Sequence, residues 1–480
     1  MKHHQPKSSL LAKATPVLLA LVLGGCAHID SARQSIDSLF NSAQFKTPSK
    51  ASNQVPVNTV PLQADWWSSL SSEQLNTLVK KAQTDNLNLT VASARLRAAQ
   101  ASLDAAQAGF FPTLNLNAGR QENTVKGQSI QGQATNNRGF FTSASLAASY
   151  EVDLWSRVRN TSEAARYQLK ASQFEKQAAR ISVTAQLADT WAQWVAADQT
   201  VKLFEEELDT FQTNLKLVEL RFRQGSAVAS DVLQQRQLVE SARGNLALAQ
   251  ANRDVLLTAL AGLVGQPPNT LTLKSETLPQ LGPLPETGLP AQVLQRRPDV
   301  QQAWAQVQAT DRNVAAAIAN RFPQISIRAS FGDQARSSDL LFDNWVRNLS
   351  VNMVAPLFDG GARSAEVVRQ RALLDQAVAE YQNAAIQALA DVDNALVQEA
   401  RQREAQESLQ RQLELAEQSL ARLFAGYRNG SVDYLSILDA QQSTSQLRRN
   451  LVNTQQQLVS FRIALYRAIS GDIPTQQAVN

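Results

Sequence analysis

Hydrophobic and polar residues alternate along four short segments of this chain, two in each half. In residues 113–119 leucines alternate with asparagines, and residues 140–150, 324–331 and 348–353 repeat the pattern with other side chains. Alternation with a period of two predicts β-strands that have one apolar and one polar face. The strands of a water-filled membrane barrel show this pattern, and so do strands of a soluble sheet that lies on a core.

Polar loops at 120–138 and 333–345 are expected to join these strands into two β-hairpins. After residue 25, no segment reaches the roughly 18–20 continuous apolar residues of a transmembrane helix, so we expect any crossing of a membrane to use the strands. Four strands cannot close a barrel, because the smallest membrane barrels need about eight and lipid does not tolerate open edges. Three chains would supply twelve strands, which is enough for a closed ring.

Very long helices are predicted after each hairpin. Residues 156–222 and 363–425 contain neither glycine nor proline, and the first run would extend about 100 Å at 1.5 Å per residue. Apolar residues recur at spacings of three and four, as in Leu413, Ala416, Leu420 and Leu423. Heptad-like seams of this kind favour extended coiled-coil hairpins, with an ordinary helical bundle as the alternative.

The second half of the chain repeats the first. Gly225 and Gly430 are 205 residues apart, and the Phe-Pro pairs at 111–112 and 322–323 both precede an alternating segment. An internal duplication of about 200 residues explains both matches. The predicted organisation is a signal peptide at 1–25, an N-terminal segment at 26–85, repeat 1 at 86–265 with its hairpin at 113–151, a proline-rich linker at 266–297, repeat 2 at 298–470 with its hairpin at 324–354, and a tail at 471–480.

The N-terminus has the features of a secretory signal. Lys2, Lys7 and Lys13 precede an apolar run that ends in Leu23-Gly24-Gly25-Cys26. Cys26 is the only cysteine, so no disulfide is possible within the chain. Its place after two glycines resembles a bacterial lipobox, which implies a covalent lipid on Cys26; an ordinary signal with an incidental thiol is the alternative.

The residue inventory argues against most enzymes. All three histidines lie at or before position 28, which excludes zinc sites and Ser-His-Asp chemistry from the body of the chain. No phosphate-binding or dinucleotide motif is present, so we expect no cofactor apart from the lipid, and carboxylate-only hydrolysis is the remaining enzymatic possibility. The formal charge of +4 includes the three signal lysines, so the mature chain is near +1 and nucleic acid is not an expected partner.

Together these motifs resemble the TolC-like outer-membrane factor family, in particular its OprM/NodT-type lipoprotein subgroup. The resemblance covers essentially the whole mature chain. It rests on the combination of several motifs, which are Leu23-Gly24-Gly25-Cys26, Trp66-Trp67, Phe111-Pro112, Phe322-Pro323, Tyr150-Glu151-Val152-Asp153-Leu154-Trp155, Arg296-Arg297-Pro298-Asp299, Pro356-Leu357-Phe358-Asp359-Gly360-Gly361 and Tyr427-Arg428-Asn429-Gly430.

The resemblance implies an α+β membrane protein that forms a homotrimer. A twelve-stranded barrel in the outer membrane of a Gram-negative bacterium would continue into a long α-helical coiled-coil barrel in the periplasm. Such trimers are exit channels of tripartite efflux pumps for drugs and other small amphipathic molecules. Their partners are a periplasmic adaptor protein and an inner-membrane transporter of the RND or a similar type. Metal efflux and protein export are alternatives within the family.

The resemblance also assigns roles to residues near the predicted helical turns. Asp439 matches the carboxylate that rings the closed periplasmic aperture, and a first-turn aspartate stabilised by the helix dipole is the alternative. Ser436 stands where some relatives carry a second acid. Tip and adaptor-docking roles are implied for Gly225, Asp231, Tyr427, Arg428 and Gly430. For Gly225 and Gly430 a simple turn is an equal alternative, for Asp231 a helix cap is favoured, and Tyr427 could instead pack in the coiled coil.

One further function is compatible with the residue pattern. A lipid-anchored periplasmic scaffold or adaptor would also contain coiled-coil helices and no pore. Adaptors usually carry one helical hairpin and a lipoyl-like β domain, whereas this chain predicts two helical hairpins alternating with two amphipathic β-hairpins. The channel interpretation is therefore favoured.

Overall fold

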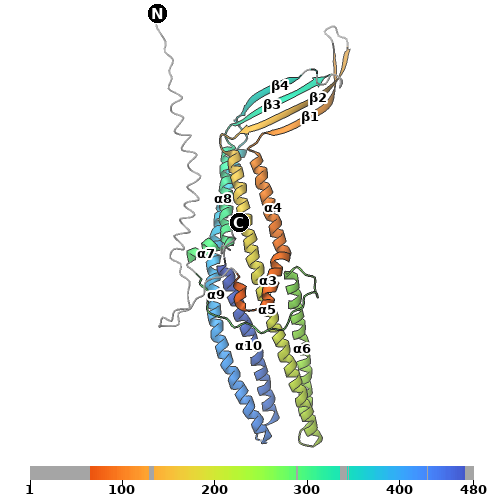
Figure 1. Cartoon of the computed structure of the whole chain (residues 1–480), viewed down its shortest axis with the longest axis vertical. Helices are drawn as coiled ribbons and strands as arrows, with labels where there is room; N and C mark the ends of the chain where they lie inside the picture. Colours follow the sequence, from red (N-terminus) through yellow and green to blue (C-terminus); the bar gives the residue numbers. More distant parts are fainter. Residues whose placement is uncertain are drawn as a thin grey trace. The chain divides into compact units, whose positions relative to one another are not determined.

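The computed structural model describes residues 65–128, 134–287, 290–335, 343, 345–429 and 431–470. Cys26, Gly430, the predicted signal peptide and the tail lie outside the described residues. The elements alternate between helices and strands in the same order in both halves (Figure 1). They are η1 (Trp66–Leu70), α3 (Glu73–Asp85), α4 (Leu87–Ala108), β1 (Thr113–Gln128), β2 (Ala134–Val152), α5 (Arg157–Arg223), α6 (Ala229–Leu263), α7 (Pro290–Arg296), α8 (Pro298–Ala319), β3 (Gln324–Ala335), β4 (Val346–Val354), α9 (Ala362–Arg428) and α10 (Tyr434–Ile469).

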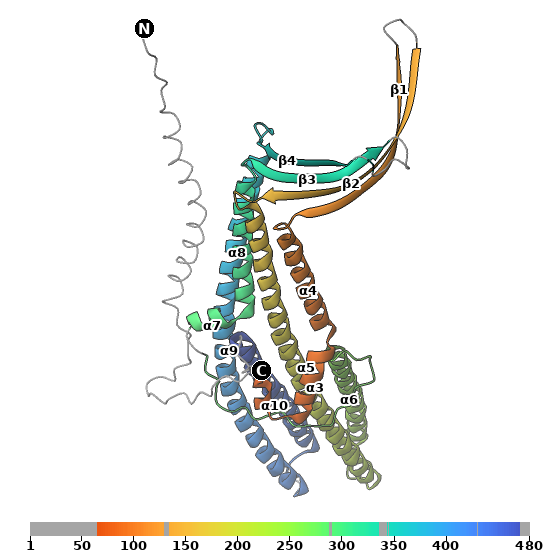
Figure 2. The same ribbon diagram turned by 45° about the horizontal axis from the view of Figure 1, so that its top comes forward.

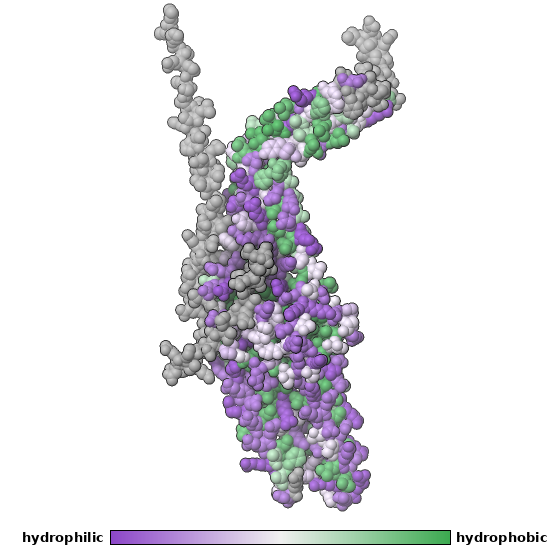
Figure 3. All heavy atoms as spheres, in the orientation of Figure 1, coloured by the Kyte–Doolittle hydropathy of each residue, from purple (hydrophilic) through white to green (hydrophobic). Residues whose placement is uncertain are grey.

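The four strands form one antiparallel sheet in the order β1-β2-β3-β4 (Figure 2). Leu116 is opposite Leu146, and Leu146 is opposite Phe331, so the apolar positions of neighbouring strands share one face. Figure 3 shows hydrophobic residues gathered over the sheet. Several remain largely exposed in the single chain, including Leu116, Leu349 and Val351. The apolar face is therefore not covered by any core among the described residues.

The strands of the first hairpin are longer than the sequence predicts. Residues 120–138 were expected to be a loop, but β1 continues to Gln128 and β2 already begins at Ala134. Alternation stops after Ala118 because Arg120 and Glu122 occupy positions of the apolar face, while backbone pairing continues through Gln128 opposite Ala134. Ladder hydrogen bonds do not depend on side-chain polarity, so the hydrophobic pattern underestimates the strand length.

The helices form two long hairpins, α5 beside α6 and α9 beside α10 (Figure 1). Helix α5 begins where the Asp153 carboxylate accepts hydrogen bonds from the N–H groups of Val158 and Arg159, at 2.9 and 2.8 Å. These bonds satisfy two of the N–H groups that a helix start leaves unpaired. No helix in the described part of the chain has the length and apolar character needed to cross a membrane.

The described residues fall into two compact units, one of residues 95–173 and 302–382 and the other of residues 65–94, 174–301 and 383–470. The second unit contains the largest hydrophobic core. Trp66, Trp191 and Ile463 are buried in it, and leucines of the linker between the repeats pack against it at positions 271, 273, 278 and 281. The linker therefore lies along this core and helps to enclose it.

Two buried arginines hold the linker and the helices of this unit together. Arg462 of α10 makes a bidentate ion pair with Glu399 of α9 at 2.8 and 2.6 Å, and both side chains are only 2% exposed. It also donates to the carbonyl oxygens of Pro283 and Gly282 in the linker, at 2.9 and 3.1 Å. Burial lowers the pKa of Arg462, but the hydrogen bonds and charge of Glu399 outweigh this and raise it overall.

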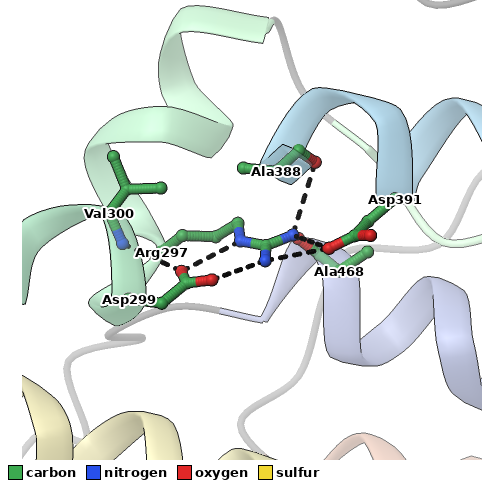
Figure 4. Close-up of polar contacts among 6 residues, drawn as sticks. All are labelled: Arg297, Asp299, Val300, Ala388, Asp391 and Ala468. Carbon is green, nitrogen blue, oxygen red and sulfur yellow. Dashed lines mark hydrogen bonds and ion pairs between the residues drawn. The ribbon is translucent and has the colours of Figure 1, made fainter. Parts of the chain in front are cut away.

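Arg297 likewise joins neighbouring segments, at the start of the second repeat (Figure 4). Its guanidinium donates to both carboxylate oxygens of Asp299, at 3.0 and 2.6 Å, and to Asp391 of α9 at 3.0 Å. The backbone carbonyls of Ala388 and Ala468 accept further bonds. The Arg-Arg-Pro-Asp motif thus joins the start of α8 to α9 and α10.

Candidate functional site

The turn between α5 and α6 requires a glycine. Gly225 has a φ of 72°, and the Ser226 N–H donates to the carbonyl of Arg221 at 2.8 Å. A left-handed residue followed by this bond is the Schellman arrangement that ends many helices. In the second hairpin the Ser431 N–H donates to the carbonyl of Gly426 at 3.0 Å. These partners are 205 residues beyond those of the first turn, so the two tips share this backbone bond.

The returning helices are capped by carboxylates at different positions. The Asp231 carboxylate, three residues inside the start of α6, accepts from the N–H of Val228 at 3.3 Å. In α10 the capping residue itself is acidic, and Asp433 accepts from the N–H and hydroxyl of Ser436. The helix-cap interpretation of Asp231 is confirmed by this geometry, and its role in adaptor docking stays a prediction.

Asp439 is exposed on α10. The helix begins at Tyr434, so Asp439 is its sixth residue and lies in the second turn. The alternative that Asp439 is a first-turn aspartate is therefore wrong, and Asp433 occupies the capping position instead. The carboxylate of Asp439 has no hydrogen-bond or ion-pair partner among the described residues. An unpaired exposed carboxylate is free to face water or a second copy of the chain.

Tyr427 connects the second hairpin to the first. The guanidinium of Arg221, from α5, lies 4.5 Å from the centre of the Tyr427 ring and donates to its hydroxyl. The ring of Tyr434 lies 5.8 Å away. Tyr427 therefore makes a cross-hairpin contact in addition to packing in the coiled coil. Arg428 is the last residue of α9 and its side chain is outside the described part.

A buried amide forms a second connection between the hairpins. Gln235 of α6 is fully buried, donates to the carbonyl of Phe211 at 2.8 Å and accepts from the Tyr434 hydroxyl at 2.9 Å. Burial, with the charges of Tyr427 and Asp231, raises the pKa of Tyr434, so its hydroxyl remains protonated and able to donate. The buried side chain is held by partners from two other helices.

Further contacts of this kind link α5 to α10. Asn214 donates to Gln441 at 3.2 Å, and Arg449 pairs with Glu207 at 2.6 Å. The Arg449 guanidinium also lies 4.7 Å from the centre of the Phe204 ring. The two hairpins are thus joined by polar contacts at successive levels of this unit.

Sequence reasoning identified Tyr427 and Asp231 but missed Arg221, Tyr434 and Gln235. Arg221 and Tyr427 are about 200 residues apart in the chain, and no local pattern pairs them. Gln235 offered one signal, since it lies three residues after Val232 and four before Val239, both of which are buried. A polar residue on an apolar seam is buried and needs a partner. No group of three or more His, Cys, Asp or Glu side chains in the described ranges could hold a metal ion.

The sequence matches the family model described as outer membrane efflux protein over residues 78–266 and 289–471. These ranges include both predicted repeats, both pairs of strands and all four long helices. The proline-rich linker separates the two matched segments, in agreement with the internal duplication.

Relatives and solved structures support this match. The chain is 31% identical to the pyoverdine export outer membrane protein OpmQ of Pseudomonas aeruginosa, over 85% of this chain and 87% of OpmQ. It is 29% identical to the cation efflux system protein CusC of Escherichia coli K12, over 96% and 99% of the two chains. The outer-membrane channel OprN superimposes with a TM-score of 0.81 at 25% identity, covering 89% of this chain and 98% of OprN.

Proposed function

Because this chain belongs to the outer membrane efflux protein family, we propose that it is the exit channel for small amphipathic molecules in a tripartite pump, with Asp439 as its periplasmic gate. The chain is an outer-membrane efflux channel of a Gram-negative bacterium, as its relatives are. Family members work as trimers, and they are transport channels rather than enzymes. The cargo, the partners and the gate residue are the proposed parts.

Small amphipathic molecules, including drugs, are the proposed cargo. The relative OpmQ is a pyoverdine export protein, which supports an organic cargo. Cations are the second candidate, because CusC matches nearly the whole length of the chain. A deletion strain complemented with this gene distinguishes them: restored tolerance to detergents and hydrophobic antibiotics supports the first, and restored tolerance to copper or silver alone supports the second.

The proposed partners are a periplasmic adaptor protein and an inner-membrane transporter of the RND or a similar type. The two hairpin tips around Gly225 and Gly430 are the proposed docking positions, with Asp231, Tyr427 and Arg428 beside them. A photo-reactive amino acid at Ser226, which is exposed, should cross-link to the adaptor in cells. The same amino acid at exposed Glu205 serves as the control position along α5, and equal cross-linking at both would contradict tip docking.

A lipid on Cys26 is the proposed membrane anchor, supported by the sequence Leu23-Gly24-Gly25-Cys26. Metabolic labelling with radioactive palmitate should mark the wild-type chain and not the Cys26→Ser variant. Equal labelling of both would overturn this assignment.

The gate proposal rests on the exposed, unpaired carboxylate of Asp439 in the second turn of α10. Three copies around a narrow water path would repel one another and attract cations. Single-channel recording in planar bilayers should show a small cation-selective current in the wild type. The current should grow, and its cation selectivity fall, in both Asp439→Ala and Asp439→Asn.

Two controls make this experiment specific. Glu205→Gln removes an exposed carboxylate from α5 and should leave the conductance unchanged, so a similar effect there would indicate general electrostatics. Unchanged conductance in both Asp439 variants would refute the gate role. No current from any variant, with insertion verified, would contradict the channel itself and favour a scaffold.

A further inference from the structure

An aromatic stack connects the second strand of the sheet to the third. The rings of Trp155 and Phe322 are 4.9 Å apart and inclined by 24°, and the Trp155 Nε1–H donates to the carbonyl of Pro323 at 2.7 Å. Val152 is opposite Ile325 in the β2–β3 ladder. Trp155 follows Val152 by three residues and Phe322 precedes Ile325 by three, so the stack continues the register beyond the strand ends.

The internal repeat contains a second copy of each half of this stack. Leu357-Phe358 follows β4 as Leu154-Trp155 follows β2, and Phe111-Pro112 precedes β1 as Phe322-Pro323 precedes β3. Trp155 and Phe322 are half-buried, whereas Phe358 is 94% exposed and Phe111 is 69% exposed. Phe358 and Phe111 are therefore the aromatic residues of a second stack, but they are not in contact within one chain.

The positions of these two residues explain why the contact is missing. In the order β1-β2-β3-β4, β1 and β4 are the two edges of the sheet, so neither has a second strand beside it (Figure 2). Phe111 adjoins one edge and Phe358 adjoins the other. Within one copy they are separated by the full width of the sheet, and only another copy can bring the two edges together.

We propose that Phe358 of one copy stacks on Phe111 of the next, so that each boundary between subunits repeats the Trp155–Phe322 stack. The inference rests on the trimeric channel of the proposed function, whose barrel closes only if β4 of one copy pairs with β1 of its neighbour. Unpaired edges in lipid leave backbone groups without partners, which requires such closure. The stack then determines the register of this pairing, that is, which residues of β4 and β1 are opposite each other.

The stack fixes which residues meet across the boundary. Counting from Phe358 opposite Phe111 in an antiparallel pair, Met353 is opposite Leu116 and Asn352 is opposite Asn117. These pairs keep apolar residues on one face and polar residues on the other, as the β1–β2 ladder does. Arg347 is then opposite Glu122 of the neighbouring copy, which pairs opposite charges directly across two strands.

The boundary differs from the internal stack in one respect. Trp155 donates a hydrogen bond to Pro323, but phenylalanine has no N–H group, so Phe358 cannot donate to Pro112 of the next copy. Replacing Phe358 by tryptophan should supply the bond that the repeat lacks. Trimer stability is therefore expected to respond to this position in both directions.

Cysteine pairs test the register. Side chains directly opposite in an antiparallel pair have Cβ atoms about 4.5–5.5 Å apart, close enough for a disulfide after small adjustments. Asn352→Cys combined with Asn117→Cys should give covalent dimers and trimers on a non-reducing gel after oxidation. The matched control, Asn352→Cys with Gly119→Cys, keeps the same face but is displaced by two residues and should link poorly.

Two further controls complete this experiment. Each single-cysteine variant should remain unlinked after oxidation. This control shows that the introduced cysteines do not form disulfides with Cys26. Ser149→Cys with Arg328→Cys, which are opposite within one copy, should oxidise without joining copies. Efficient linking of the displaced pair, or no linking of the Asn352–Asn117 pair in an intact trimer, would overturn the proposed register.

Heat dissociation of the trimer in detergent tests the stack itself. Phe358→Ala should lower the dissociation temperature by about 1–2 °C, the scale expected when a chain of this length loses one aromatic pair per boundary, and Phe358→Trp should raise it. Leu357→Ala is the matched control, because Leu357 is 95% exposed and adjacent in sequence but outside the stack.

The outcomes separate this inference from the proposed function. If the trimer forms and conducts but neither Phe358 variant changes its dissociation temperature, the stack is refuted and the channel is not. If wild-type chains remain monomeric in membranes, the trimeric channel fails, and the stack fails with it.

Discussion

Two glycines at helix ends illustrate how much a single residue can control. Gly225 and Gly265 have φ values of 72° and 70°, in the left-handed region that favours glycine. Their surroundings differ. A Cβ at position 225 would meet no atom within 4 Å, whereas a Cβ at position 265 would lie 2.3 Å from the carbonyl oxygen of Asp85.

We therefore expect Gly265→Ala to be more destabilising than Gly225→Ala. The Gly225 variant should cost about 1–2 kcal/mol from backbone strain alone, and the Gly265 variant should cost several kcal/mol because Asp85 must also move. Thermal unfolding of the two variants beside the wild type measures the difference. Equal losses would show that the contact with Asp85 is not a constraint.

The pKa of Asp299 predicts how acid affects the protein. Burial raises the pKa of Asp299, but the hydrogen bonds and charge of Arg297 outweigh burial and place it below the ordinary 3.8. A depressed folded-state pKa contributes stability above the unfolded value, and this stability is lost as the pH falls through the folded value.

Asp299→Asn should consequently lower stability at pH 7 and make it less sensitive to acid below about pH 4. Thermal unfolding of variant and wild type at pH 7 and pH 3 tests this, with Glu205→Gln as the control for an exposed acid. A variant as acid-sensitive as the wild type would show that this carboxylate does not respond as inferred.

At the scale of elements, polar side chains join the helical hairpins in addition to the hydrophobic core that contains Trp191 of α5 and Ile463 of α10. Gln235 is fully buried between the Phe211 carbonyl and the Tyr434 hydroxyl. A buried amide that loses a partner costs about 1–3 kcal/mol. The Gln235 amide therefore stabilises the contact between the hairpins only while both of its hydrogen-bond partners are present.

Tyr434→Phe tests this connection, because it removes the hydroxyl and keeps the ring. We expect a loss of about 1–3 kcal/mol, and we expect the Tyr434→Phe, Gln235→Leu double variant to recover part of it, since both polar groups are then absent. Urea unfolding of the wild type, Tyr434→Phe, Gln235→Leu and the double variant measures the coupling. Strictly additive losses would argue against the Tyr434–Gln235 bond.

The elements also show what the sequence can predict. The fold class is confirmed, because long helices and amphipathic strands are encoded locally by spacing and alternation, as in 113–119 and 156–222. The ends of β1 and β2 were missed because Arg120 and Glu122 interrupt the alternation while backbone pairing continues. Contacts such as Arg221–Tyr427 depend on how two distant helices lie together, and no local pattern contains that information.

At the scale of the whole molecule, the linker between the two repeats contributes to cohesion. It is attached to both helices of the second hairpin through Arg462 and Glu399, which are buried together. Breaking one half of a buried ion pair leaves an uncompensated charge, typically at a cost of about 3–5 kcal/mol.

Glu399→Gln should therefore be among the most destabilising substitutions in the chain, with a loss of about 3–5 kcal/mol. Glu404→Gln is the matched control, since Glu404 pairs with Arg401 at an exposed position and should cost less than about 1 kcal/mol. Thermal unfolding compares them, and similar losses would show that burial of the Arg462 pair does not matter.

The different caps of α6 and α10 have a consequence for the symmetry of the assembled channel. Three copies present six hairpin tips in a ring, but Asp231 caps from inside one helix, whereas Asp433 caps from the residue that precedes the other. The ring therefore contains six helical tips, but only three of each capping type. A partner that docks on these tips would therefore meet two kinds of binding position in alternation, and each kind can change by mutation without altering the other.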